Sequence, residues 1–251
     1  LKINDLILSV YEDFGFTEEL VIKLSTRPEK RVGTDAMWDH AEDVMRTVLK
    51  QIEAQHGNVV TTAINPGEGA FYGPKFEYTL RDAIGREWQC GTTQVDFNLP
   101  ERFGLEYTAP DGQKKRPVMI HRAPFGSMER FIAILLEHTA GNFPLWLMPE
   151  QAIILSLSEK YENYAKKVLD LLENHEIRAL IDNRNETIGK KIREAETKKF
   201  PFMLIVGEEE EKTGTVSVRR HGQEGRGNAS FSIEDFAALV NEEVAKTLKT
   251  F

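Results

Sequence analysis

Hydrophobic positions in the first part of the chain repeat at helical spacing in two places. Leu6, Val10 and Phe14 lie four residues apart and Gly15 follows them, which predicts a helix that ends there. Residues 35–56 carry a longer apolar stripe at the same spacing, which predicts a second helix. The chain therefore opens with amphipathic helices that must cover another layer.

Other runs in this part have the pattern of strands. They lie at residues 20–25, 76–82, 87–97 and 118–123. A turn at Ile84-Gly85 joins the second run to the third, which is the arrangement of a hairpin and predicts an antiparallel sheet. Ser127 follows the last run at the position of a helix N-cap, and the apolar residues behind it repeat at helical spacing.

The pattern changes between residues 142 and 149, where two prolines bracket a short aromatic stretch. Behind it, strand-like runs alternate with helix-like runs. The strands are predicted at residues 152–157, 177–181, 202–206 and 215–219, and the helices at residues 161–172, 187–199 and 232–248. This order predicts a small α/β domain with a largely parallel sheet. We place the boundary near residue 145, which gives domains over residues 1–144 and 145–251.

Composition restricts the cellular setting. Cys90 is the only cysteine among 251 residues, which excludes disulfides within the chain and suits a reducing cytosol. No apolar run is long enough for a transmembrane helix, and no secretory signal opens the sequence, so a cytoplasmic location is expected. The first residue, Leu1, indicates a cut inside a longer protein.

The formal net charge of −8 is not typical of a nucleic-acid-binding protein. Phosphate contact is a local property, however. Residues 184–199 hold twice as many basic as acidic residues, and Arg219, Arg220 and Arg226 form a second basic cluster. Binding of RNA by the second domain therefore stays open.

The segment from Pro117 to His138 carries the clearest candidate chemistry. An apolar strand delivers His121, and a glycine turn leads to a helix whose first turn holds Ser127 and Arg130. A helix N-terminus favours anions, and the planar fork of an arginine there can grip a phosphate. Alternatively, Arg130 pairs with a neighbouring glutamate on a solvated face. His121 is either a metal ligand or a hydrogen-bonded core histidine.

Two glycine-containing stretches are weaker candidates. The loop at residues 67–75 allows close approach of the backbone to a ligand, but it fits neither a P-loop nor a dinucleotide fingerprint, and an ordinary loop is the alternative. Gly91 interrupts a predicted strand, which indicates either a ligand packed on that face or a β-bulge.

Several motifs of this chain together carry a resemblance to a known family. Arg116-Pro-Val-Met-Ile-His-Arg-Ala, followed by Gly126-Ser-Met-Glu-Arg-Phe, looks like the third signature motif of the class II aminoacyl-tRNA synthetases in its threonyl form. Similar threonyl-type motifs lie at residues 23–31, 67–75, 88–97 and 182–193. The resemblance covers essentially the whole chain. It implies a combined α/β and α+β fold: part of an antiparallel-sheet catalytic domain, then an α/β anticodon-binding domain with a mixed sheet.

The resemblance also implies an activity and its residues. A threonine–tRNA ligase activates threonine with Mg-ATP and transfers it to threonine tRNA. Arg130 would bind the γ-phosphate of ATP, and His121 would be one of three ligands of a zinc ion that holds the amino and hydroxyl groups of threonine and so rejects valine. The residues implied to line the ATP and substrate pocket are Tyr72, Lys75, Gln89, Thr92 and Ser127. The residues implied to read the anticodon are Asn185, Lys199, Glu210 and Arg219.

Some family features are missing from the sequence. The resemblance implies that a cysteine and a second histidine upstream of Leu1 complete the zinc site, and Cys90 is not at that cysteine position. The first class II motif, which forms the homodimer interface, and the second, which holds the α-phosphate and adenine, are absent. Alternatively, therefore, the isolated chain is a tRNA-binding module without catalytic activity. A sister enzyme for proline or histidine and a regulatory paralogue are less consistent with His121 and Arg130.

Overall fold

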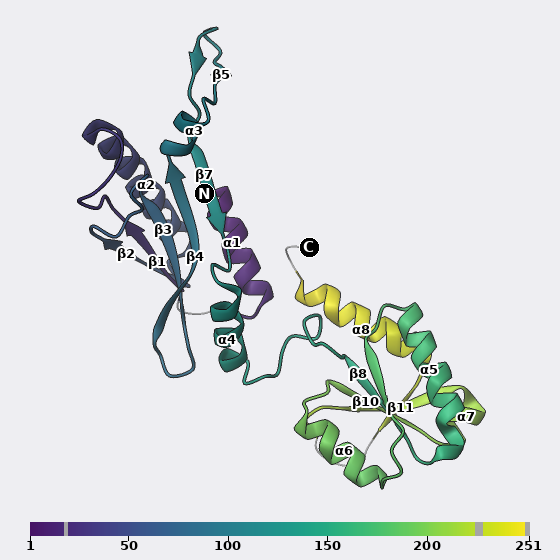
Figure 1. Ribbon diagram of the computed structural model, residues 1–251. Coiled ribbons are helices and arrows are strands. Elements are labelled where there is room, and N and C mark those ends of the chain that lie inside the picture. The colour runs from purple at the N-terminus through teal and green to yellow at the C-terminus, as the bar shows by residue number, and fades with distance from the viewer. Residues whose placement is uncertain (18–19, 224–227, 249–251) are drawn as a thin grey trace. The chain divides into compact units, whose positions relative to one another are not determined.

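The computed structural model of the chain describes residues 1–17, 20–223 and 228–248. The chain forms two compact units, one over Leu1–Ala140 and a second that begins at Gly141 (Figure 1). Each unit has its own five-stranded sheet. Within the described ranges, no helix combines the length and the apolar character needed to cross a bilayer.

The first unit is a sheet with helices on its apolar face. Its elements are α1 (Lys2–Asp13), β1 (Leu20–Ser25), α2 (Asp35–His56), β2 (Val60–Asn65), β3 (Lys75–Arg81), β4 (Glu87–Asp96), α3 (Asn98–Arg102), β5 (Tyr107–Thr108), β6 (Lys114–Lys115), β7 (Met119–Ala123) and α4 (Met128–His138). The strand order is β2-β1-β3-β4-β7, and β5 and β6 form a separate small ribbon.

Alternation along the strands separates an apolar face from a polar one. Ile22, Leu24 and Tyr78 are fully buried on one face, because paired residues of neighbouring strands point the same way. Helix α1 packs on this face, and its Tyr11 donates a hydrogen bond of 2.7 Å to the carbonyl oxygen of Pro124. The opposite face carries polar side chains, among them Lys23, Lys75, Glu77, Gln94 and His121.

The predicted helices and the hairpin of β3 and β4 are confirmed. The predicted antiparallel sheet is confirmed for β1, β3, β4 and β7, while β2 pairs parallel with β1 at the edge. Strand β2 was not predicted, because an edge strand with one covered face shows only weak alternation. The mixed sheet that was predicted for the second unit is also confirmed.

Gly91 belongs to a β-bulge. The register between β3 and β4 shifts so that Tyr78 faces Gly91 and Thr79 faces Gln89, which leaves Cys90 as the extra residue. A Cβ on Gly91 would lie 2.6 Å from the Tyr11 hydroxyl oxygen and 2.8 Å from the carbonyl oxygen of Pro124. The close approach at this glycine is therefore made by the chain itself, and of the two alternatives the bulge is confirmed.

The second unit is a sheet between helices. Its elements are β8 (Ala152–Ser156), the 3₁₀ turn η1 (Glu159–Tyr161), α5 (Glu162–Asn174), β9 (Ala179–Asp182), α6 (Ile188–Thr197), β10 (Phe202–Val206), α7 (Glu208–Thr213), β11 (Thr215–Arg220), β12 (Ala229–Ser232) and α8 (Ile233–Thr247). The strand order is β12-β11-β10-β8-β9. Strands β8, β9 and β10 are parallel, while β11 and β12 run antiparallel to their neighbours.

Two apolar clusters hold this sheet. Helices α5 and α8 pack on one face, around Ile154, Leu204 and Phe236, and α6 packs on the other, around Leu155 and Met203. Helix α7 was not predicted, because its run of four glutamates resembles a solvated segment. It forms because negative charge favours a helix N-terminus, and because Gly214 ends it in the left-handed conformation at φ 71°.

Candidate active site

A row of polar residues crosses all five strands of the first unit. Asn65, Ser25, Lys75, Gln94 and His121 are successive partners from β2, β1, β3, β4 and β7. Directly paired residues project to the same face, so the polar face carries one side chain from each strand along this row. Lys75 and His121, which lie far apart in the sequence, are thereby brought to one surface, two strands apart.

The bulge at Cys90 adds Gln89 to the same surface. Glu77 pairs with Thr92 and Thr79 pairs with Gln89. Since Glu77 and Thr79 are two residues apart, they share a face, and so do their partners. Without the extra residue, Gln89 and Thr92 would project to opposite faces. The bulge therefore places two of the predicted pocket residues on one side of the sheet.

Tyr72 and Gln94 are connected on this face. The Tyr72 hydroxyl donates to Oε1 of Gln94, and Nε2 of Gln94 donates to the Thr92 hydroxyl over 3.2 Å. Burial, followed by the charge of Asp96, raises the pKa of Tyr72, so the phenol stays a donor. The Tyr72 ring centre lies 6.2 Å from that of His121. Gln94 was missed by the sequence prediction, although its spacing of two from Thr92 is the signal that finds it.

A buried carboxylate lies beside Lys75. The ammonium of Lys75 is 2.7 Å from Oε1 of Glu77, and Asn65 donates an amide hydrogen bond of 3.4 Å to the other oxygen. Glu77 is buried, so its charge is held by these partners. Glu77 was also missed by the sequence prediction. Its spacing of two from Lys75 places it on the polar face.

His121 is held by a buried aspartate. Its Nε2 lies 2.8 Å from Oδ2 of Asp96, whose side chain is 2% exposed. Burial alone would raise the pKa of Asp96, but hydrogen bonds from His121 and two backbone amides lower it. The carboxylate therefore accepts, and Nε2 donates. In the described part of the chain, no cluster of three or more His, Cys, Asp or Glu residues could hold a metal ion.

Ser127 and Arg130 lie at the start of α4, as predicted. The Ser127 hydroxyl caps the helix by accepting from the Arg130 amide over 3.3 Å, and it donates to Glu129 over 2.7 Å. The guanidinium of Arg130 donates to the carbonyl oxygen of Gln89 over 2.7 Å. Among the described residues, the guanidinium of Arg130 contacts this carbonyl oxygen and the Trp88 ring, so the alternative of a glutamate partner is not observed.

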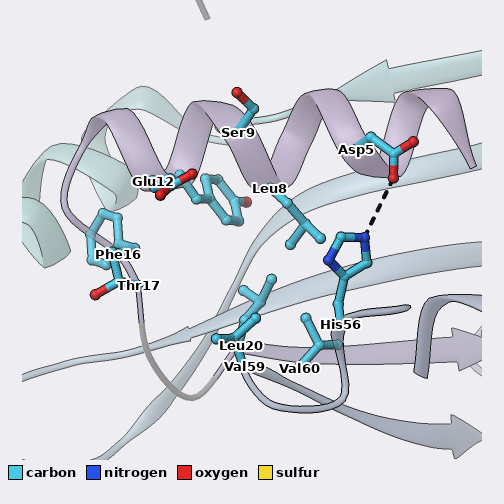
Figure 2. A pocket seen from close by; sticks show the side chains of 11 residues that line it. Asp5, Leu8, Ser9, Glu12, Phe16, Thr17, Leu20, His56, Val59 and Val60 are labelled. Atoms are coloured by element: carbon cyan, nitrogen blue, oxygen red, sulfur yellow. Dashed lines mark ion pairs between the residues drawn. The ribbon is translucent and has the colours of Figure 1, made fainter. Parts of the chain in front are cut away.

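One cavity of the first unit lies away from these residues. It measures about 400 Å³ and is lined by α1, the end of α2 and the start of β1 and β2 (Figure 2). Leu8, Leu20 and Val60 form an apolar part of its wall, and His56 lies 3.6 Å from Asp5 at its rim. None of the predicted pocket residues lines it. The candidate site is therefore the polar face.

In the second unit, Glu210 and Arg219 have partners within the chain. One oxygen of Glu210 accepts from the Gly207 amide over 2.9 Å, and the other accepts from the Ser217 hydroxyl over 2.7 Å. Arg219 lies 3.4 Å from Glu196 of α6. Ser217 and Arg219 alternate with buried valines along β11, so both project to the face that carries α6.

The other two predicted anticodon residues flank α6. Asn185 is exposed in the loop between β9 and α6, and Lys199 follows the helix with a left-handed backbone at φ 61°. Helix α6 thus separates Asn185 from Lys199, while Arg219 lies beside the helix. Arg226, part of the predicted basic cluster, lies outside the described residues.

Sequence comparisons support this division into two kinds of unit. The model of the "tRNA synthetase class II core domain (G, H, P, S and T)" matches residues 2–139, more than half of the chain, and that of the "Anticodon binding domain" matches residues 151–243. The threonine–tRNA ligase of Flavobacterium johnsoniae is 66% identical over the whole chain, and that of Rhodopseudomonas palustris is 61% identical over 99% of it. The chain belongs to the class II tRNA synthetases of the group that the core model describes, and it is similar to threonine–tRNA ligases.

Solved structures agree with this family. The structure described as the RNA binding domain of threonyl-tRNA synthetase from Cryptosporidium parvum is 38% identical, with a TM-score of 0.87, and the match covers 96% of this chain and 59% of that one. A putative threonyl-tRNA synthetase from Aeropyrum pernix, at 24% identity and a TM-score of 0.74, shares the fold. The chain spans 38% of the length of the threonine–tRNA ligases from Flavobacterium johnsoniae and Rhodopseudomonas palustris.

Proposed function

We propose that the complete protein is a threonine–tRNA ligase and that this chain supplies one wall of its catalytic site together with its anticodon-binding domain. The observation that carries the proposal is the row of polar residues that ends at His121, within a chain of this family. The carboxylate of threonine attacks the α-phosphate of ATP in line, and pyrophosphate leaves. A hydroxyl at the 3′ end of threonine tRNA then takes the threonyl group, and AMP leaves. The complete enzyme is a cytoplasmic homodimer.

His121 is one ligand of a zinc ion in this proposal. Its fit is supported by the ring nitrogen Nδ1, for which no partner is found among the described residues, while Nε2 is held by Asp96. The remaining ligands, a cysteine and a histidine, come from outside this chain. Zinc, when bound, supplies a Lewis-acid centre that coordinates the amino and hydroxyl groups of threonine, which valine cannot match.

Arg130 binds the γ-phosphate of ATP, which enters as its magnesium complex. Its support is a position in the first turn of α4, beside a cap that leaves further helix amides free for an anion. Gln89 and Thr92 lie near the ribose of the nucleotide, and Ser127 lies close to the amino-acid site. Tyr72 and Lys75 line the adenylate pocket. The chemistry of these residues is positioning and charge neutralisation, and none of them needs to transfer a proton to activate the carboxylate.

The second domain recognises the anticodon in this proposal. Asn185 and Glu210 offer amide and carboxylate groups, and Lys199 and Arg219 offer cationic donors, which are the groups that read base edges or hold phosphate. The partners of Glu210 and Arg219 within the chain fix their side chains before RNA arrives. Preorganised groups lose less entropy on binding.

The test of the activity is threonine-dependent exchange of pyrophosphate into ATP by the full-length protein. Exchange driven by threonine, and by neither proline nor histidine, is the expected result. Exchange driven by another amino acid would overturn the proposal. The same assay on the isolated 251-residue chain addresses the alternative of a tRNA-binding module: absence of exchange together with binding of threonine tRNA is the result expected for that module.

A further inference from the structure

The buried carboxylate of Asp96 contacts His121 on the ring nitrogen that is not offered to zinc. We propose that Asp96 is a positioning residue, which fixes the tautomer and the ring orientation of His121 so that Nδ1 stays unprotonated and available to zinc. This inference rests on the proposed zinc-binding role of His121. Asp96 does not touch the substrate in this proposal and acts only through the histidine.

Asp96 is itself rigidly held. Its Oδ1 accepts hydrogen bonds from the backbone amides of Asn98, over 2.7 Å, and Leu99, over 3.0 Å, at the start of α3. The other oxygen, Oδ2, is 2.8 Å from Nε2 of His121. The side chain is 2% exposed, so water does not compete for either oxygen. Each oxygen of the carboxylate therefore has a separate, fixed partner.

The direction of the hydrogen bond between His121 and Asp96 determines the tautomer of His121. An ionised carboxylate can only accept, so Nε2 of His121 must carry its proton. A neutral imidazole has one N–H group, and Nδ1 is then left with a free lone pair, which is the form that binds a metal. Histidines that bind metals commonly donate their other ring nitrogen to a carboxylate, which orients the ring and raises its basicity.

The strand register explains how the two residues meet. His121 of β7 pairs with Gln94 of β4, and Asp96 lies two residues further along β4 on the same face. Diagonal neighbours of this kind are within reach of long side chains. Asp96 is also the last residue of β4, so the amides of α3 are directly available to fix it.

Asp96→Asn is the most informative substitution. The amide keeps one oxygen for the two amides of α3, so the cap of that helix is retained. Its NH₂ group, however, faces Nε2 of His121 as a second donor. The imidazole must then move its proton to Nδ1 or turn away, and both changes remove the lone pair offered to zinc. Asp96→Ala removes the cap as well, so Asp96→Asn carries the test if the alanine variant does not fold.

The experiment measures zinc affinity of the full-length protein by competition with a chelator, for wild type, Asp96→Asn, Asp96→Ala, His121→Ala and Asp111→Asn. Asp111 is a matched control, since its carboxylate also accepts from a side-chain nitrogen, that of Lys115 at 2.7 Å, and from a backbone amide, but lies in the exposed turn between β5 and β6. Substitution of cobalt for zinc gives an absorption spectrum that reports ligand geometry. Melting temperatures verify that each variant is folded.

We expect Asp96→Asn to bind zinc about 10–100-fold more weakly than wild type, with an altered cobalt spectrum, and Asp111→Asn to bind as wild type does. Wild-type zinc affinity in folded Asp96→Asn, with loss of zinc in His121→Ala, would overturn the positioning role while leaving the zinc ligand in place. Wild-type affinity in His121→Ala would overturn the proposed ligand and the inference together. The two failures are thus distinguishable without measuring aminoacylation.

Discussion

The guanidinium carbon of Arg130 lies 5.9 Å from the centre of the Trp88 ring. The indole is fixed in turn, because its Nε1 donates a hydrogen bond of 2.9 Å to the buried carboxylate of Asp82. Arg130 is therefore held by an aromatic face and by the carbonyl oxygen of Gln89, and by no carboxylate of the described residues. Its charge stays available for a phosphate.

Trp88→Leu tests this arrangement in the full-length protein. A cation–π contact at a partly exposed site contributes about 0.5–1 kcal/mol, so we expect the KM for ATP to rise about 2- to 5-fold, with the KM for threonine unchanged. Trp88→Phe keeps an aromatic face and is the matched control, with a smaller rise. Equal rises in both KM values for Trp88→Leu would instead indicate a general disturbance of the fold.

The Asp82 carboxylate makes the stability of the folded state depend on pH. Burial alone would raise the pKa of Asp82, but hydrogen bonds from Trp88 and Arg86 and from two backbone amides lower it to about 2. An aspartate in an unfolded chain titrates near pH 3.9. Between these two pKa values the unfolded state binds more protons than the folded state. The stabilisation of the fold by the Asp82 carboxylate is therefore complete above about pH 4 and is lost as the pH falls toward 2.

Asp82→Asn removes that titration. We expect the melting temperature of the variant to lie below that of wild type at pH 6, and the difference to shrink as the pH falls from about 4 toward 2. Thermal unfolding followed by tryptophan fluorescence at several pH values measures the difference. Asp111→Asn, which removes an exposed carboxylate, is the control. A difference independent of pH would show that the carboxylate acts by packing and not by charge.

Features of the site that depend on residues close together in the sequence could be predicted, and features that depend on residues far apart in the sequence could not. Helical spacing predicted α2 and α4, and the N-cap chemistry of Ser127 predicted where α4 begins. These are local properties, since a cap satisfies amides two or three residues away. The family resemblance then supplied expected roles for His121 and Arg130, which spacing had left open.

The surroundings of those residues were not predictable in the same way. The bulge at Cys90 depends on which residues of β3 face which residues of β4, and periodicity within one strand does not fix that register. Asp96 and His121 lie on two different strands, and only the pairing of β4 with β7 brings them together. Sequence spacing could have identified Gln94 and Glu77 as face-sharing neighbours, but not their hydrogen bonds.

Gly126 offers a test of how closely β4 approaches the turn before α4. Its φ is +64°, and an added Cβ would lie 2.0 Å from the carbonyl oxygen of Cys90. Gly112 also has a positive φ, of +78°, but an added Cβ there would meet nothing within 4 Å. The two glycines share the backbone conformation and differ in the contact, so they form a matched pair.

We expect Gly112→Ala to destabilise the protein by about 1–2 kcal/mol, the cost of a left-handed conformation for a residue with a Cβ. Gly126→Ala should destabilise it more, because the backbone must also move away from Cys90. Chemical denaturation measures both. Equal losses would mean that the turn relaxes without cost and that the approach to β4 is loose.

Arg219 is one of the residues proposed to read the anticodon, and its side chain has partners within the chain. It lies 3.4 Å from Glu196 and donates a hydrogen bond of 2.7 Å to the carbonyl oxygen of Gln223. Because the guanidinium is fixed before RNA binds, Arg219→Ala should weaken binding of threonine tRNA by about 1–3 kcal/mol if the side chain reads a base edge. Equilibrium binding to the full-length protein at constant salt measures this loss.

Arg184→Ala is the control, since Arg184 is also ion-paired in this domain, at 2.6 Å to both Asp182 and Glu194. A base-reading Arg219 predicts that Arg219→Ala loses affinity for threonine tRNA and leaves the weaker binding of other tRNAs unchanged. A phosphate contact predicts an equal loss for every tRNA and a salt dependence reduced by about one unit of slope. The anticodon assignment stands only if the loss is confined to threonine tRNA, because phosphate is common to all tRNAs and base edges are not.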